Sequence, residues 1–244
     1  MNKTLLYLTM PLVAIAVIAG CRHDVTCGFA GWDRAARQDM RDVIVLSDLS
    51  NADKGNAILS LAGRYAETAL SMSDSIAQLL PERSRRLFKN ERQAYERWRT
   101  WQETVYLELI GDIWDLWYGG SALGSFQTLH IYRIEDRNLE DNLELCRLLC
   151  GESAQEDIVE DVSLFQLKEE ADLLLNEVTD KEYQDKMAQT ISIDLGILRE
   201  WLSTREEFSK SLPWRVRREY DKQTNAWLLL CRSQYDRRFC YETK

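Results

Sequence analysis

The sequence is poor in proline, glycine and histidine. Its 244 residues include three Pro, 11 Gly and two His. A β-sandwich or β-barrel needs many tight turns, which Gly and Pro supply, so this composition argues against both folds. Two histidines leave little for histidine-based metal binding or acid–base chemistry. The composition therefore favours a helical protein that is not an enzyme.

Positive charge is also in short supply. The chain has 31 Lys and Arg against 40 Asp and Glu, a formal net charge of −9 and a pI near 5.0. A general nucleic-acid-binding protein needs a basic face for the phosphates, so we expect no nucleic-acid partner. With 45% hydrophobic residues the chain has enough apolar surface for a core, and 29% charged and 10% aromatic residues are not typical of disorder.

Residues 1–20 have the pattern of a cleaved secretion signal. The apolar run Leu5–Ala19 is too short to span a membrane and has the length of a signal-peptide core. It ends in Ile18-Ala19-Gly20-Cys21, which resembles the bacterial lipobox. The resemblance implies cleavage before Cys21, acylation of that residue and attachment to a membrane leaflet, with residues 21–31 as a tether. The alternative is a buried N-terminal helix.

The residues around the cleavage site indicate a destination and a final charge. Arg22 stands where an Asp would retain an enterobacterial lipoprotein in the inner membrane, so the resemblance implies the outer membrane, facing the periplasm. Cleavage removes Lys3 and no acidic residue, which leaves 30 basic against 40 acidic residues and a net charge of −10. We therefore expect an acidic, lipid-anchored protein of the cell envelope.

Apolar residues recur at helical spacing along the chain. Between residues 82 and 117 they step by 7, 3, 7, 4, 4 and 3, at Phe88, Tyr95, Trp98, Val105, Leu109, Ile113 and Leu116. Such steps form one stripe of a helix and differ from the alternation of a strand. Similar stripes run through 164–178, 187–202 and 216–230. We predict an all-α fold of antiparallel helices joined by short loops.

One segment of the chain occurs twice. Leu80-Pro81-Glu-Arg83-Ser-Arg85-Arg86 recurs 132 residues later as Leu212-Pro213-Trp-Arg215-Val-Arg217-Arg218. At the same distance, Phe88 and Ala94-Tyr95 have counterparts in Tyr220 and Ala226-Trp227. Convergence on a helix start explains the Leu-Pro pairs but not the arginines and aromatic residues in register. The repeat therefore predicts a tandem duplication of a helical domain.

Short motifs follow the repeated segments. In the first half they are Ala94-Tyr95-x-x-Trp98-Arg99, Gly119-Gly120-Ser121, and Arg133 and Arg137 before Leu139. In the second half they are Asp172-x-x-Leu175-Asn176 and Ala226-Trp227. Together they resemble the signature of the LprI-like lysozyme-inhibitor family, small secreted helical domains. The resemblance implies two divergent copies, one in residues 32–150 and a truncated one in 151–244.

Two further features are candidate contact sites. Trp117 and Tyr118 precede the Gly119-Gly120-Ser121 loop, and aromatic residues beside a flexible loop are typical of interaction surfaces. The alternative for this aromatic pair is the core. The arginine triplets have the wrong sign for a helix N-terminus, so they either pair with carboxylates of a neighbouring helix or form an anion site.

Cysteines follow Cys21 at five positions, and an extracytoplasmic location permits disulfides. The locally plausible pairs are Cys146 with Cys150 and Cys231 with Cys240, although the connectivity stays open. The first pair requires the helix to end there, because a bridge within a regular helix is strained. Without a histidine near the first pair we expect no metal site, and we expect no cofactor.

These patterns favour a binding protein. The family resemblance implies binding, and inhibition, of lysozyme-type cell-wall hydrolases. Many lysozymes are basic, so an acidic partner gains long-range attraction and a fast, salt-sensitive association. The alternative is a structural or envelope-assembly lipoprotein that binds another envelope protein through its helical bundle.

We predict that Cys21→Ser abolishes acylation and membrane anchoring, because the thiol is the group that receives the lipid. Mass spectrometry of the processed chain and fractionation of the membranes measure both effects. Globomycin should block processing of the wild-type chain. A wild-type chain that is uncleaved and soluble would contradict the lipobox interpretation.

Overall fold

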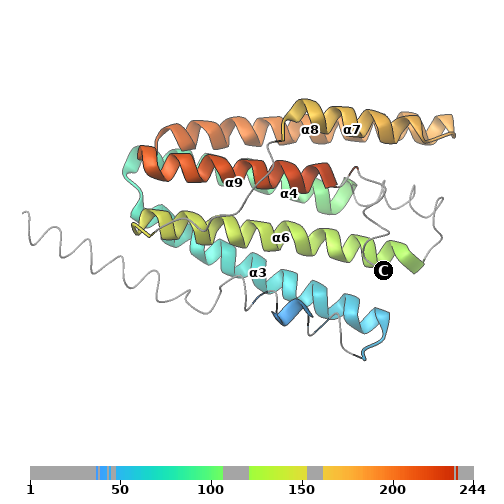
Figure 1. Cartoon of the computed structure of the whole chain (residues 1–244), viewed down its shortest axis with the longest axis horizontal. Helices are drawn as coiled ribbons and strands as arrows, with labels where there is room; N and C mark the ends of the chain where they lie inside the picture. The colour runs from blue at the N-terminus through green and yellow to red at the C-terminus, as the bar shows by residue number, and fades with distance from the viewer. Residues whose placement is uncertain are drawn as a thin grey trace, which may run out of the picture.

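Helices make up the described part of the chain. The computed structural model describes residues 37, 39–42, 44, 48–106, 121–152, 162–233 and 235. The elements are α3 (Asn51–Leu79), α4 (Glu82–Trp101), the π-helix η1 (Gln102–Tyr106), α6 (Ser121–Leu149), α7 (Leu164–Asn176), α8 (Lys181–Lys210) and α9 (Trp214–Ser233). These residues contain no strand, which confirms the predicted all-α bundle (Figure 1). Within the same ranges, no helix has the length and apolar character needed to cross a membrane.

The local sequence explains several helix ends. The side chains of Ser50, Ser163 and Asp180 accept hydrogen bonds from backbone N–H groups in the first turns of α3, α7 and α8. Gly151 ends α6 with a φ of 87°, a left-handed conformation that glycine adopts without strain. In this conformation the Gly151 and Glu152 N–H groups bond to carbonyls of the last turn of α6.

Most neighbouring helices are antiparallel, as predicted. In the α4/α8 pair, Ser84 contacts Ser211 at one end and Gln102 contacts Asp194 toward the other. α3 and α6 instead run parallel, since Tyr65 packs on Tyr132 and, further along both helices, Ser73 bonds to Asn142. The prediction of antiparallel packing is wrong for this pair, because α4 carries the chain back to the end where α3 began before α6 starts (Figure 1).

The helices enclose two cores. The first core joins α3 and α6 to one end of α4, α8 and α9, and it includes Tyr65, Phe88, Tyr132, Phe208 and Tyr220. The second core lies among α4, α7, α8 and α9. At its centre is an aromatic cluster of Tyr95, Trp98, Trp201 and Trp227, with ring centroids 5.0 to 6.2 Å apart.

The two occurrences of the repeated segment form the same structure. Pro81 and Pro213 each precede a helix directly, and both helices, α4 and α9, are 20 residues long. Each helix follows a long one, α3 with 29 residues and α8 with 30. Both cores contain residues from either side of position 150, so the helices of the two predicted domains pack as one bundle. The duplication itself stays a prediction.

A buried ion pair ties four helices together at the centre of the bundle. The Arg205 guanidinium of α8 donates two hydrogen bonds, each 2.7 Å long, to the carboxylate of Asp141 in α6. It also lies 3.6 Å from Glu91 Oε1 of α4 and donates to Thr224 of α9 at 2.8 Å. The Trp201 indole N–H donates to the same Glu91 oxygen at 2.7 Å. These five residues are the Arg205 network.

Burial and charge act in opposite directions in this network. Burial disfavours the ionised form of Asp141, but the Arg205 guanidinium outweighs burial and holds the Asp141 pKa below its ordinary value. The same attraction raises the pKa of Arg205 despite its burial. The guanidinium also lies 3.9 Å from the centroid of the Tyr220 ring, a cation–π contact. Both groups are therefore charged in the folded protein.

We predict that Arg205→Ala lowers the free energy of unfolding by about 3–5 kcal/mol, because it leaves the Asp141 and Glu91 carboxylates buried without a cation. Urea unfolding followed by circular dichroism measures the change. Arg97→Ala is the matched control, since Arg97 joins the same helices through an exposed pair with Glu200 and should cost less than about 1 kcal/mol. A smaller loss for Arg205→Ala than for Arg97→Ala would contradict a central role.

Candidate functional site

A groove opens where α3 and α4 diverge from their shared turn, with α6 as its floor. Its volume is about 630 Å³, which is the size of a typical ligand or side-chain pocket. The lining residues are Ala66, Glu67, Leu70 and Ser73 of α3, Arg92, Gln93, Glu96, Arg97 and Arg99 of α4, and Glu135 and Asn138 of α6. The Leu70 side chain is 65% exposed, so the groove offers one apolar contact among charged groups.

The floor of the groove carries a buried carboxylate. Glu135 is 1% exposed, and its Oε1 accepts a hydrogen bond from Arg99 Nε. Its second oxygen, Oε2, is buried and accepts no hydrogen bond. Burial raises the pKa of Glu135, and the Arg99 cation acts against this effect. An unpaired oxygen on a buried carboxylate is costly, so this atom is the natural acceptor for a donor that enters the groove.

Arg99 is shared among three carboxylates. Besides Glu135, its guanidinium contacts Glu96 at 3.1 Å and Glu103 at 3.2 Å. Burial raises the pKa of Glu103, again against the attraction of Arg99. Three carboxylates exceed the charge of one arginine, so this corner of the groove favours a further cation.

The other side of the groove leads back to the Arg205 network. Arg92 donates to Asn138 Oδ1 at 2.8 Å, and its guanidinium carbon lies 4.2 Å from the centroid of the Tyr95 ring. Arg92 Nε also lies 3.9 Å from Glu91 Oε2. The groove is therefore built directly on the buried ion pairs of the bundle.

A second polar cluster lies beside the π-helix, an element often found at functional positions. Gln102 donates to Asp194 Oδ1 at 2.5 Å, and Tyr235 donates to Asp194 Oδ2 at 3.0 Å. His130 Nε2 lies 3.0 Å from Gln102 Oε1. Burial raises the pKa of Asp194 to about 6, against the effect of these two hydrogen bonds. Burial and Arg133 lower the pKa of His130 to about 3, so the imidazole is neutral at physiological pH.

The predicted contact loop lies mainly outside the described residues. Trp117, Tyr118, Gly119 and Gly120 are not among them, and Ser121 is the first residue of α6. Cys21 and Cys240 also lie outside. The lipidation site and the contact loop therefore stay predictions.

The family-motif residues fall into four environments. Those in the second core are Ala94, Tyr95, Trp98 and Trp227. Leu175 and Ala226 are half-buried, whereas Asp172 and Asn176 are exposed on α7. Arg99 alone among them lines the groove. Most of the motif therefore serves core packing.

The cysteines that the structure describes are thiols. Cys146 and Cys231 are buried and free, so the candidate bridge between Cys146 and Cys150 is not formed, whereas Cys240, the candidate partner of Cys231, lies outside the described residues. Cys146 lies within α6 and Cys150 follows one turn later, with the regular backbone bond between them intact. This helical geometry disfavours a bridge between the two. Burial and the neighbouring Cys150 raise the pKa of Cys146 to about 12.

Glu135, Leu70 and Asn138 were not predicted as site residues. Each lies in a helical stretch where a charged or apolar residue is ordinary, and only the pairing of α3 with α6 brings them to one groove. The described chain places no group of three or more His, Cys, Asp or Glu side chains in reach of one metal ion.

Comparison with known proteins found no match among family models, curated proteins or solved structures. The resemblance to the LprI-like family therefore rests on its short motifs.

We predict that Asp194→Asn changes the pH dependence of stability. The Asp194 carboxyl has an ordinary pKa of 3.8 and a folded-state pKa of about 6. Between these values the folded state keeps a proton that the unfolded state has released. Wild-type stability therefore falls as the pH rises from about 4 to 6, by about 3 kcal/mol in total. Asparagine cannot ionise, so this part of the fall should disappear.

Urea unfolding at several pH values between 4 and 7 measures this effect. Asp172→Asn, at an exposed position of α7, is the control and should retain the wild-type pH dependence. An unchanged fall in Asp194→Asn would mean that Asp194 is already ionised in this range.

Proposed function

We propose that this chain is a lipid-anchored, extracytoplasmic binding protein of the cell envelope that holds a basic protein partner, with a lysozyme-type cell-wall hydrolase as the candidate. The lipobox-like segment supports the anchor, and the net charge of −9 supports a basic partner. The motif resemblance supports a lysozyme.

The observation that carries the proposal is the Glu135 carboxylate in the groove. A lysine or arginine side chain of the partner would donate to Glu135 Oε2, which has no other hydrogen bond. Glu96 and Glu103 also contact Arg99, so three carboxylates surround one guanidinium at this corner, while Arg92 and Arg97 line the rest of the groove. Leu70 on the α3 side would pack against the stem of the same side chain or its neighbour. The groove thus favours a cationic residue beside an apolar one.

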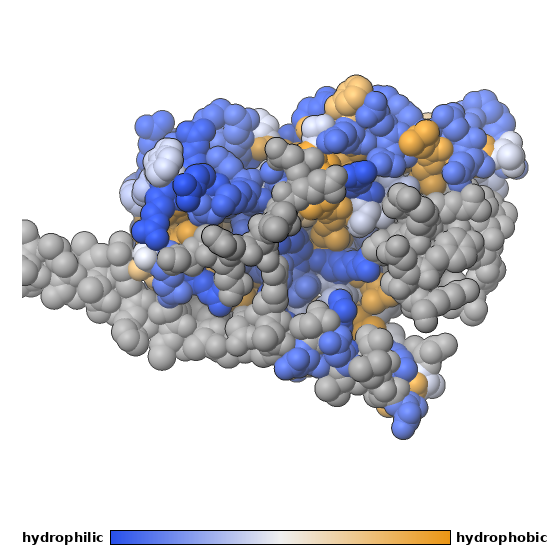
Figure 2. All heavy atoms as spheres, in the orientation of Figure 1, coloured by the Kyte–Doolittle hydropathy of each residue, from blue (hydrophilic) through white to orange (hydrophobic). Residues whose placement is uncertain are grey.

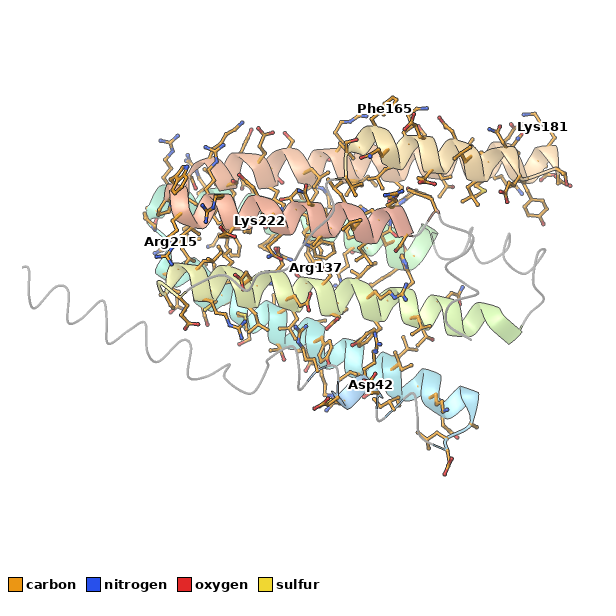
Figure 3. The ribbon with its side chains drawn as sticks, in the orientation of Figure 1. Asp42, Arg137, Phe165, Lys181, Arg215 and Lys222 are labelled. Carbon is orange, nitrogen blue, oxygen red and sulfur yellow. The ribbon has the colours of Figure 1, made fainter. Side chains whose placement is uncertain are left out.

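An envelope-assembly role is the second candidate. Phe165 and Leu173 on α7 are 68% and 62% exposed, and they are eight residues apart, close to one face of the helix. Exposed apolar residues at this spacing suit contact with another helix. Figure 3 shows Phe165 on the outer side of α7, directed away from the bundle.

We predict that the purified, acylated chain inhibits turnover of cell-wall substrate by a basic lysozyme, and that Glu135→Gln weakens the inhibition by about tenfold to a hundredfold. The factor corresponds to the loss of a charged hydrogen bond. Inhibition of the wild type should also weaken as salt is added, because charge steers the association.

Glu169→Gln is the matched control, since it removes the same charge at an exposed position of α7 outside the groove. It should change inhibition by less than about twofold. Equal effects of the two variants would contradict binding at the groove. No inhibition at micromolar excess would exclude lysozyme, and recovery of another envelope protein from solubilised membranes would then select the assembly role.

A further inference from the structure

The two copies of the repeated turn lie together at one end of the bundle. Ser84, in the first turn of α4, donates to the Ser211 carbonyl just before α9 at 3.3 Å. Beneath this contact, Phe208 packs between Phe88 and Tyr220, with centroid distances of 5.1 and 5.3 Å. The starts of α4 and α9 therefore form one surface, which we name the basic end and define as residues 80–89 and 206–222.

The basic end has the opposite charge to the whole chain. Its two segments contain nine Lys and Arg against five acidic residues, whereas the chain has 31 against 40. Four of the acidic residues are neutralised within the basic end by Arg85, Lys210, Arg217, Arg218 and Lys222. Figure 2 shows strongly hydrophilic side chains gathered over this end of the molecule.

Two of the repeated arginines, Arg85 and Arg217, bond to groups within the fold. Arg85 donates from Nε to the Ala77 carbonyl at 2.7 Å and from Nη2 to the Leu80 carbonyl at 3.1 Å. These bonds satisfy carbonyl groups at the end of α3. Arg217 pairs with Asp221 on its own helix at 3.6 Å. The middle arginine of each triplet is therefore occupied.

The remaining cations of the basic end face solvent. Arg83, Arg86, Lys89 and Arg215 are exposed, and within the described structure their side chains make no ion pair or hydrogen bond. These four side chains therefore contribute no ion pair to the described fold. The guanidinium groups among them match phosphate oxygens in charge and in geometry.

An exposed tryptophan stands among these cations. Trp214 is 73% exposed, and the Arg218 guanidinium carbon lies 5.3 Å from its ring centroid. Tryptophan with neighbouring arginine is typical of the interface between a membrane and water, where the ring sits at the level of the lipid headgroups. Figure 3 shows Arg215 at this end and Lys181 at the opposite end of the molecule.

We propose that the basic end docks onto the anionic phospholipid surface to which the chain is anchored, with Trp214 inserted at headgroup level and Arg83, Arg86 and Arg215 on lipid phosphates. This inference rests on the proposed acylation of Cys21. Because the anchor keeps the bundle beside the membrane, a patch of modest affinity is sufficient to orient it.

The length of the tether allows this orientation. Arg37 is held on α6 by Asp136 and Glu140. Arg37 lies 16 positions after Cys21 in the sequence, and a chain of this length can span at most about 50 Å. Along α6, Asp136 lies about 18 Å from Leu148, which shares the first core with Leu80 and Leu212 of the basic end. The anchored cysteine can therefore reach a membrane that touches the basic end.

The test uses the acylated full-length chain after its own processing, reconstituted in vesicles that contain brominated lipids. Mass spectrometry establishes the acylation, and flotation in 1 M salt establishes the anchoring, independently of docking. Docking is measured as the quenching of tryptophan fluorescence by the brominated lipids. The part that counts is the quenching seen in the wild type and absent in Trp214→Phe. We expect it on vesicles with 30% phosphatidylglycerol, and we expect it to vanish on phosphatidylcholine vesicles and in 1 M salt.

The triple variant Arg83→Gln, Arg86→Gln, Arg215→Gln should weaken docking on the order of 100-fold, at about fivefold per arginine. Its unfolding curve should match the wild type, because these side chains have no partner. The control Lys168→Gln, Lys181→Gln, Lys186→Gln removes three positive charges from exposed pairs elsewhere on α7 and α8 and should dock like the wild type.

Several results would overturn the docking proposal while leaving the anchor intact. One is a floating, acylated chain whose Trp214 is not quenched on anionic vesicles. Equal quenching on both kinds of vesicle, or equal losses in the two triple variants, would also exclude recognition of headgroup charge by the basic end. Binding of a soluble polyanion without docking would reassign the patch to that class of ligand. A chain that carries no acyl groups would instead contradict the proposed acylation of Cys21.

Discussion

The arrangement of the bundle depends on the Arg205 guanidinium. It is a cation with almost no solvent contact, so every hydrogen-bond donor on it must find an acceptor inside the protein. Asp141 supplies two acceptors from α6, Glu91 a negative charge from α4, and Thr224 a hydroxyl from α9. Apolar packing is less directional than hydrogen bonds and ion pairs, so this set of contacts restricts the register of the four helices more strictly than the apolar stripes do. The aromatic cluster packs around α8 in that register, with Trp201 bonded to Glu91.

The groove follows from the same constraint. α4 is held to α8 by Glu91, while α3 packs along α6 through contacts such as Ser73 with Asn142. Because α3 and α4 belong to different helix pairs, they diverge from their shared turn although they are consecutive in the chain. The space between them exposes the side of α6 that carries Glu135 and Asn138. A buried carboxylate at that place is costly in the isolated protein, and Arg99 offsets this cost for one of its two oxygens only.

Periodicity was sufficient to predict helices in the regions of α4, α7, α8 and α9, because a spacing such as that of Phe88, Tyr95 and Trp98 reflects one buried face. It was not sufficient to predict how the helices pair. Stripes on six helices are equivalent in kind, and the parallel packing of α3 and α6 depends on contacts such as Tyr65 with Tyr132. The candidate site was missed for the same reason. A glutamate such as Glu135 in a helical sequence is ordinarily on a solvated face, and only tertiary contacts make it buried.

The distribution of charge gives the bundle a polarity. The turn that joins α3 to α4 belongs to the basic end, and Leu70 of the groove lies ten residues before Leu80, about 15 Å along α3. A membrane that holds the basic end through Trp214 would therefore lie next to the turn from which the groove widens, and α3 and α4 would extend away from the lipid. In that orientation the carboxylates around Arg99 face the aqueous space, where a soluble basic protein approaches. Under both proposals, the repeated arginines would attach the bundle at the turn, and the carboxylates around Arg99 would recognise the partner beyond it.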